Sequence, residues 1–436
     1  MNKIDMKLRL GFLACVLGCA SAAWAQSEVA PSKVAPSELA PSEQDYLPSA
    51  AAVRATLDAS PAVAAARAMR ESATARAEGI RAGSAEYVVR AIRQNRFVRE
   101  PSDNFAEGQL AIERPLRLWG KSDADAALAE ATLNQSEIAL DDAEHETARQ
   151  MLALWFKLLR TRQASAAVAR SASLAGELVA LTGKRVRAGD AAPMDLEIAQ
   201  AEEARARAAL AGARTAQDAA QAELRARFPA LGLPGEAQSL LALPAAPGNG
   251  VDSSTRTRFL QANHALRLAL ADEAIAQRSA RRSDLERKPD PTVGAFVIVE
   301  RGGAERIAGL SVSMPLGSVH RRSAAAAAAA DAQASARRRA LVEQTVGAEF
   351  DVLVRTVTGL DQAARAHQAA LALDQSAADR AGRAYAAGEI SIGQLLVVRR
   401  GLSETSLATY AALVDALEAR EKLRLELHQG SRFESH

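Results

Sequence analysis

Histidine is the side chain of this sequence best suited to hold a transition metal, so the spacing of the histidines comes first. The six histidines stand at His145, His264, His320, His367, His428 and His436. No two of them are four residues apart, the spacing that places two ligands on one face of a helix. His145-Glu146 begins a string similar to a zinc-protease motif, but Arg149 stands where that motif needs its second histidine. We therefore expect no metal site, and we regard each histidine as a solvated or packed side chain.

The sequence shows few other features that are typical of a catalytic site. The chain has no glycine-rich phosphate loop, and both of its cysteines, Cys15 and Cys19, lie near the amino terminus. A formal net charge of +2 gives no general electrostatic reason to bind nucleic acid. We expect a protein that is not an enzyme, with no catalytic residue and no cofactor.

The amino terminus has the features of an export signal. Lys3, Lys7 and Arg9 form a basic region before an apolar run. Ala25 ends a small-x-small cleavage site, so Gln26 would begin the mature protein. The sequence therefore predicts that the protein leaves the cytoplasm.

A second interpretation of this region stays open. Val16-Leu17-Gly18-Cys19 resembles a bacterial lipobox, in which Cys19 would carry the lipid, although Leu17 fits that pattern poorly. Cleavage after Ala25 would instead leave a mature chain without cysteine, so disulfides would contribute nothing. Residues 26–48 repeat Ala-Pro-Ser and are expected to form an extended linker.

The rest of the chain has the composition of long helices. It is rich in alanine, arginine, leucine and glutamate, and aromatic residues make up only 4% of the sequence. Helix signals predict helices over residues 49–81, 120–187, 193–227, 320–387 and 391–427. The two longest would be rods of roughly 100 Å at 1.5 Å per residue. The helices 49–81 and 193–227 together match the first rod in length, so they should stack end to end beside it.

Two parts of the chain repeat each other at a separation of about 200 residues. Gly183–Leu196 matches Gly382–Leu395 in both glycines, a basic residue, an acid and a leucine. A shift of about one residue also aligns Gln109–Leu116 with Gly309–Leu316. The chain is therefore a tandem repeat. We divide it into a signal peptide (1–25), a linker (26–48), a first repeat (49–228), a linker or equatorial segment (229–256), a second repeat (257–428) and a tail (429–436).

Each repeat also contains two segments that alternate as β-strands do. The expected strands are 87–98 and 107–115 around a turn at 99–104, and 292–300 and 307–314 around a turn at 301–303. Leu110 and Ile112 share one face, as do Leu310 and Val312, which is typical of transmembrane barrel strands. Two surface hairpins on a helical protein are the simpler alternative, but isolated hairpins are only marginally stable. Because four strands cannot close a barrel, these strands require other copies of the chain.

These features together resemble the TolC-type outer-membrane factors, which are outer membrane efflux proteins, over about residues 49 to 428. Pro115 and Pro315 stand shortly before Lys121 and Arg321, as at the strand-to-helix joints of that family. The glycine-acid turns of the two repeats match its helix-turn-helix tips. The resemblance implies a mainly α fold with a small β part, in which each repeat combines a strand hairpin with long coiled-coil helices. Three chains would form a trimeric α/β barrel, with a twelve-stranded outer-membrane β-barrel and a periplasmic helical tunnel.

The resemblance also implies partners and a location. The homotrimer would sit in lipid of the cell outer membrane, with a periplasmic extension that docks on a periplasmic adaptor (membrane fusion) protein. The adaptor would connect it to an inner-membrane pump of the resistance–nodulation–division class. Alanine-rich tips and short outer loops look most like the heavy-metal resistance subgroup, which exports cobalt and nickel or cobalt, zinc and cadmium. An outer-membrane factor for organic drugs or type I secretion is the alternative.

The resemblance assigns adaptor docking to the helix tips. The implied docking residues are Arg187, Gly189, Asp190, Asp195, Leu196, Gly388, Glu389, Ser391 and Leu395. The family places aspartates after the second tip turn, where they narrow the periplasmic entrance. This sequence has Gln394 and Val397 there, followed by Arg399 and Arg400, so the second repeat is not expected to form an acidic gate.

A secreted coiled-coil scaffold without a channel is the candidate from another class. Such a scaffold has no use for lipid-facing hairpins placed symmetrically in both repeats. The alternating strands therefore favour the channel.

Overall fold

The computed structural model describes residues 46–100, 102–234, 253–317, 319–428 and 431–433. The chain divides into two units, Met1–Ser42 and Glu43–His436, and the described residues all belong to the second. The predicted signal peptide, the cleavage site at Ala25 and Gln26, and the lipobox around Cys19 lie outside the described residues. Those assignments remain predictions.

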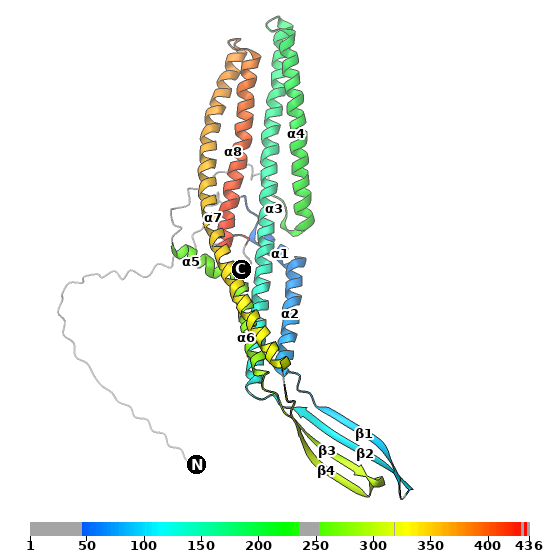
Figure 1. Cartoon of the computed structure of the whole chain (residues 1–436). Helices are drawn as coiled ribbons and strands as arrows, with labels where there is room; N and C mark the ends of the chain where they lie inside the picture. Colours follow the sequence, from blue (N-terminus) through cyan, green and yellow to red (C-terminus); the bar gives the residue numbers. More distant parts are fainter. Residues whose placement is uncertain (1–45, 101, 235–252, 318, 429–430, 434–436) are drawn as a thin grey trace, which may run out of the picture. The chain divides into compact units, whose positions relative to one another are not determined.

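The helices and strands follow the same order in both halves of the chain (Figure 1). The first half contains α1 (Ala50–Asp58), α2 (Pro61–Ala82), β1 (Val88–Arg99), β2 (Ser102–Pro115), α3 (Lys121–Ala188), α4 (Pro193–Arg227) and a short 3₁₀ helix, η2 (Pro229–Leu231). The second contains α5 (Ser253–Ala262), α6 (His264–Leu285), β3 (Thr292–Glu300), the 3₁₀ turn η4 (Arg301–Gly303), β4 (Glu305–Ser313), α7 (Val319–Ala386) and α8 (Ile392–Glu426). The structure confirms the expected mainly α fold with a small β part.

Two of the sequence-based boundaries were wrong. The helix expected over 49–81 is broken into α1 and α2, because Pro61 has no backbone N–H and takes the first position of a new helix. The Ser49 cap is confirmed, since its Oγ accepts from the Ala52 amide at 3.2 Å. The first hairpin turn is also shorter than expected, because Arg99 already pairs with Ser102 across the two strands.

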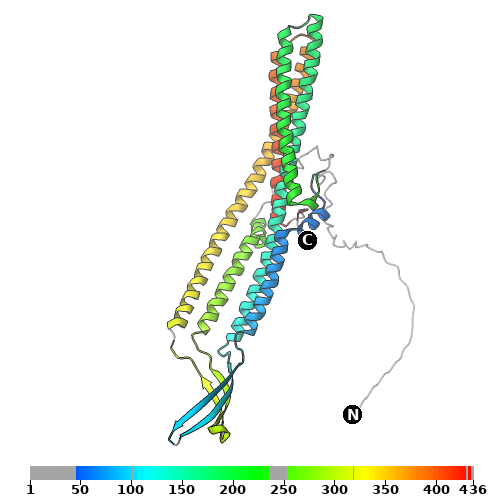
Figure 2. The ribbon, with the colours of Figure 1, turned by 90° about the vertical axis from the view of Figure 1, so that its right-hand side faces the viewer.

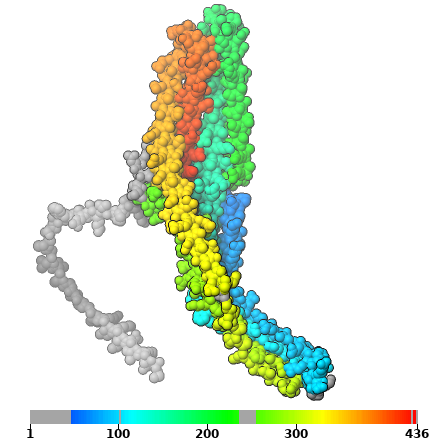
Figure 3. All heavy atoms as spheres, in the orientation of Figure 1, coloured from blue at the N-terminus to red at the C-terminus, as the bar shows by residue number. Residues whose placement is uncertain are grey.

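The long helices of the two halves carry the shorter ones along their sides. Helix α3 contacts both α2 and α4, and α7 contacts both α6 and α8. Figure 2 shows α2 and α4 following one another along α3, which confirms the expected stacking. In Figure 3 the α7 side chains are visible along the length of the helical part. With 68 residues each, α3 and α7 are about 100 Å long.

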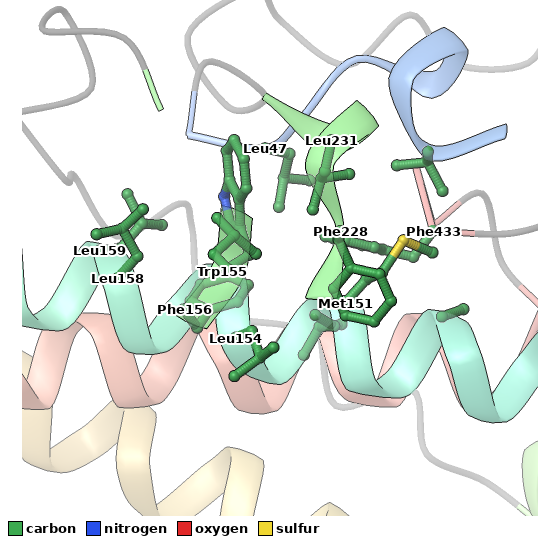
Figure 4. Close-up of a cluster of buried hydrophobic side chains, with 14 of the residues drawn as sticks. Leu47, Met151, Leu154, Trp155, Phe156, Leu158, Leu159, Phe228, Leu231 and Phe433 are labelled. Atoms are coloured by element: carbon green, nitrogen blue, oxygen red, sulfur yellow. The ribbon is translucent and has the colours of Figure 1, made fainter. Parts of the chain in front are cut away.

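The main core lies at the middle of α3, where several segments converge (Figure 4). Met151, Trp155 and Phe156 of α3 are buried against Phe228, which follows α4, and Phe433 near the carboxyl terminus. The Trp155 indole also donates to the backbone carbonyl of Tyr46 at 2.7 Å. This cluster ties the ends of the chain's described part to the centre of the helical bundle.

Among the described residues, one helix, α3, is long and apolar enough to cross a membrane by length and composition alone. The core helix of a soluble protein passes the same test. The stretch of α3 that meets this test is 28% buried within the single chain.

Candidate functional site

The four strands form one antiparallel sheet in the order β1-β2-β3-β4, and their register gathers apolar side chains on one face. Directly opposed residues share a face, so Val89, Ile112, Ala295 and Leu310 make one row across the sheet. Ala91, Leu110, Val297 and Ala308 make the next row. The Leu310 and Val312 side chains are 85% and 73% exposed in the single chain. The sheet therefore presents a continuous apolar face that this chain does not cover.

Charged side chains bound this apolar face at both ends. The row of Arg93, Gly108, Val299 and Arg306 closes one end, and Arg114 lies at the other. Six residues separate Val312 from Arg306, which is about 20 Å of strand. A transmembrane barrel has an apolar band about 25 Å tall between its polar rims. The apolar face has the height and the borders of such a band.

The opposite face of the sheet is mixed, because Arg90, Gln94, Glu107 and Glu113 share it with Ile92, Phe296, Ile298 and Ile307. Glu107 is 3% exposed; its Oε2 accepts a hydrogen bond from Gln94 at 2.9 Å, and its Oε1 forms an ion pair with Arg96 at 2.9 Å. Arg90 pairs with Glu113 at 3.5 Å. A sheet with one apolar face and one face that carries charged side chains is compatible with a strand wall between lipid and an aqueous lumen.

Both outer strands of this sheet have an unpaired edge. β1 pairs with β2 alone and β4 pairs with β3 alone within the described part of the chain. The unpaired backbone N–H and C=O groups along a strand edge can form hydrogen bonds with another strand. The two edges are therefore suited to meet edges of further copies.

A buried lysine joins the sheet to the helices in the first repeat. The Lys121 side chain is 0% exposed, and its Nζ lies 3.1 Å from Glu286 Oε2 and 2.9 Å from Asp290 Oδ2. Nζ also donates to the Lys288 carbonyl at 2.8 Å. Because β2 ends at Pro115 and β3 starts at Thr292, this contact fixes the angle at which both strands leave the helices.

Removing the Lys121 ammonium should weaken this joint. We expect Lys121→Met, which keeps most of the side-chain volume, to lower the free energy of unfolding by about 2 kcal/mol. The value lies below that of a fully buried pair because Glu286 and Asp290 retain 43% and 20% exposure. Denaturant titration of the protein in mild detergent measures the change.

The second joint offers the matched control for this prediction. Arg321 occupies the position equivalent to Lys121, but its guanidinium donates to the backbone carbonyls of Pro315 (3.3 Å) and Gly317 (2.7 Å). Arg321→Met should therefore cost about 1 kcal/mol or less. Equal losses at Lys121 and Arg321 would contradict the assigned role of the buried lysine.

The two helix tips are built in the same way. Gly189 has φ +80° and Gly388 has φ +79°, both in the left-handed region that favours glycine. The amide after each glycine bonds back across the last helical turn, Asp190 to the Arg185 carbonyl at 2.8 Å and Glu389 to the Ala384 carbonyl at 2.9 Å. This is the Schellman geometry, so the repeated glycine-acid pair ends each long helix in one defined turn.

Capping explains several of the residues that follow the tips. Ser391 Oγ accepts from the Gln394 amide at 3.3 Å, and Gln394 Oε1 accepts from the Ser391 amide at 2.9 Å. Asp195 holds the equivalent place in the first repeat and accepts from the Ala192 amide at 3.3 Å. Gln394 and Asp195 therefore help to start the return helices, which accounts for a polar residue at both positions.

Side chains also tie the two tips together. Arg185 donates to the Tyr385 carbonyl at 2.8 Å and lies over its ring, and Thr182 hydrogen-bonds the Tyr385 hydroxyl at 2.9 Å. Farther along, Arg400 forms an ion pair with Glu202, and this hydrogen bond and charge lower the pKa of the Glu202 carboxyl. The first-repeat and second-repeat hairpins are thus linked within one chain.

Not all of the expected docking residues are exposed, so fewer of them can form a docking surface than the sequence predicted. Arg187, Gly189, Asp190, Gly388, Glu389 and Ser391 are exposed. Leu395 is 1% exposed and packs with Leu178, Ala199 and Ile392 between the hairpins, so it cannot contact a partner directly. Leu196 and Asp195 are half-buried. Leu395 therefore packs between the hairpins, and the docking role of the tip residues stays a prediction.

The structure also brings together histidines that the sequence analysis treated as separate. His145 of α3, His264 of α6 and His428 after α8 place one possible ligand atom each within 4.8 Å of one another. They are more than 100 residues apart along the chain, so no local spacing rule could have found them. The expectation of isolated histidine side chains was wrong for these three.

Comparisons with known proteins identify the fold. No family model matches the chain, and a sequence comparison with curated proteins finds no significant match. The outer membrane protein VceC of Vibrio cholerae superposes with a TM-score of 0.70 at 19% identity, covering 88% of this chain and 96% of VceC. CusC, studied for transmembrane channel formation, gives 0.68 at 14% identity, covering 86% and 92%. The Campylobacter jejuni CmeC outer membrane channel gives 0.71 at 13% identity, covering 88% and 86%.

These structural similarities define the fold class. The chain has, over most of its length, the fold of outer-membrane channel subunits. The helix tips, joints and four-stranded sheet described above are the parts of that fold available to carry function.

Proposed function

We propose that the protein is a TolC-type outer-membrane factor, the outer-membrane channel of a tripartite efflux system. One observation carries the proposal: a four-stranded sheet has an uncovered apolar face, an opposite face that carries charged side chains, and two unpaired edges. Lipid would cover the apolar face, and the opposite face would line water. The shared fold with outer-membrane channels supports the same reading.

The unpaired edges support a homotrimer. Three copies would join β1 of one chain to β4 of the next and close a barrel of twelve strands without any free edge. The long helices that begin at Lys121 and Val319 would extend from this barrel into the periplasm as a tunnel. An open four-stranded sheet with exposed Leu310 and Val312 would otherwise be prone to aggregate.

The exposed tip residues form the proposed docking surface for a periplasmic adaptor, which would connect the channel to an inner-membrane pump of the resistance–nodulation–division class. Each tip lies at the end of a 68-residue helix that starts near the sheet, so it would be far from the outer membrane. The Gly189-Asp190 and Gly388-Glu389 turns are rigid, exposed and repeated. A defined protruding turn is suited to contact a partner.

Heavy-metal cations are the proposed cargo, either cobalt and nickel or cobalt, zinc and cadmium. Short hairpin loops and alanine-rich helices support this subgroup. Organic drugs or a type I secretion substrate are the alternative cargo for the same channel. Deleting the gene should lower tolerance to the exported metals several-fold and leave tolerance to organic drugs unchanged. The reverse pattern would favour the drug channel.

Cell fractionation tests the channel itself. We expect the full-length protein in the outer-membrane fraction, running as a trimer in mild detergent. A periplasmic monomer would favour the secreted coiled-coil scaffold instead. The assay needs no knowledge of the cargo, so it separates the channel proposal from the metal proposal.

A further inference from the structure

Three histidines from three distant segments meet beside the main core. The ring centroids lie 4.7 Å apart for His145 and His264, 5.5 Å for His145 and His428, and 5.3 Å for His264 and His428. Three imidazoles on a tetrahedral zinc ion, with Zn–N of about 2.0–2.1 Å, have centroids roughly 5 Å apart. The rings are therefore already at the separation that a shared ion would require.

The most buried of the three has an unsatisfied nitrogen. His264 is 8% exposed, and its Nδ1 has no hydrogen-bond partner in the described part of the chain. An unpartnered imidazole nitrogen in this position is available to accept a metal ion.

A carboxylate orients the second histidine. His145 Nε2 lies 3.4 Å from Glu426 Oε2, and Arg149 Nε lies 3.3 Å from the other oxygen of the same carboxylate. A histidine that binds metal with one nitrogen commonly donates its other N–H to such a carboxylate.

The third histidine ends a helix in an unusual conformation. His428 has φ +50°, a left-handed backbone that few residues other than glycine adopt. The three histidines border a cavity of about 450 Å³, which leaves room for a water or a further ligand. Arg267, which also lines it, is paired with Asp141 at 3.4 Å, so its charge is partly offset.

We propose that His145, His264 and His428 form a binding site for one divalent transition-metal ion per chain, with an open fourth position. Three imidazole nitrogens suit zinc, nickel, cobalt or copper(II), whereas magnesium and calcium prefer oxygen ligands. Binding would draw the nitrogens from up to 4.8 Å apart to about 3.3 Å, the spacing on a tetrahedral ion. The ion would pin the end of α8 to α3 and α6. The inference does not depend on the channel or on its cargo.

Metal titration of the purified protein tests the site. The full-length protein, prepared without added histidines, is stripped with a chelator and titrated with Zn²⁺ by calorimetry and with Co²⁺ by visible absorption. We expect one Zn²⁺ per chain, a tetrahedral Co²⁺ spectrum and a raised melting temperature, because an ion that binds only the folded state stabilises it. Magnesium should have no effect.

Variants distinguish this site from surface binding. His264→Ala should weaken Zn²⁺ binding by at least about 100-fold, and Glu426→Gln by about 10-fold to 100-fold. His264→Cys should retain binding and add a sulfur-to-cobalt absorption band, which also shows that the variant folds. His320→Ala and His367→Ala, outside the cluster, should bind as the unaltered protein does. Equal binding by His264→Ala and His320→Ala, or no Zn²⁺ binding at all, would overturn the proposal.

Discussion

Cells that carry Gly388→Val should keep a normal amount of trimer in the outer membrane but lose efflux. Gly388 has φ +79°, where a β-branched residue is strained by roughly 1–2 kcal/mol or somewhat more. An added Cβ would meet nothing closer than Arg185 Nη2 at 3.6 Å, so there is no steric clash that would unfold the helices. The strain is confined to the tip turn, and the turn is the proposed docking surface.

Two matched substitutions distinguish a specific effect on the tip turn from a general loss of folding. Gly388→Asn should preserve efflux, because asparagine tolerates the left-handed conformation better than other residues. Gly393→Ala should be neutral, since Gly393 lies inside α8 and its nearest atom to an added Cβ is Ser391 Oγ at 3.8 Å. Trimer abundance and metal tolerance are measured together. Full tolerance in Gly388→Val with normal trimer would refute the docking role, and loss of both would indicate a purely structural turn.

Leu310→Arg should largely prevent insertion of the protein into the outer membrane. Leu310 lies between Val312 and Arg306 on β4, inside the apolar face, and is 85% exposed in the single chain. An arginine near the middle of the bilayer costs about 2–4 kcal/mol on a barrel surface. Each trimer would carry the change three times. The fraction of protein recovered in the outer membrane measures the effect.

The neighbouring residue supplies the control. Ser311 lies opposite Gly294 on the mixed face, which also carries Glu113 and Glu107. Ser311→Arg should therefore insert nearly as well as the unaltered protein. Equal yields of Leu310→Arg and Ser311→Arg would contradict the assignment of the two faces.

Local signals predicted most of the fold. Pro193 at the first helical position allowed the start of α4 to be placed correctly, and period-2 alternation placed β3 at Thr292–Glu300. The break at Pro61 should have been predicted, because this proline stands in the interior of the helix expected over 49–81, where a proline removes a hydrogen bond and breaks or kinks the helix.

Long-range contacts account for what the sequence did not predict. The Lys121 contact spans 165 residues to Glu286, and the three histidines span α3, α6 and the end of α8. Their meeting depends on how the helices pack, which no spacing along the chain reveals. Gln394 was read as a missing gate residue, whereas its hydrogen bonds with Ser391 give it a capping role.

Cysteine cross-linking between copies tests the central claim most directly. One cysteine replaces Ala91 on β1, and a second is moved through residues 305–313 of β4, in a mature chain with no other free thiol if cleavage follows Ala25. A closed barrel predicts that covalent trimers form in the outer membrane when the second cysteine is at alternating positions of β4, on the same face as Ala91. A chain with only one of the two cysteines should form no covalent trimer. The account is contradicted if no position from 305 to 313 yields a covalent trimer while the protein remains folded.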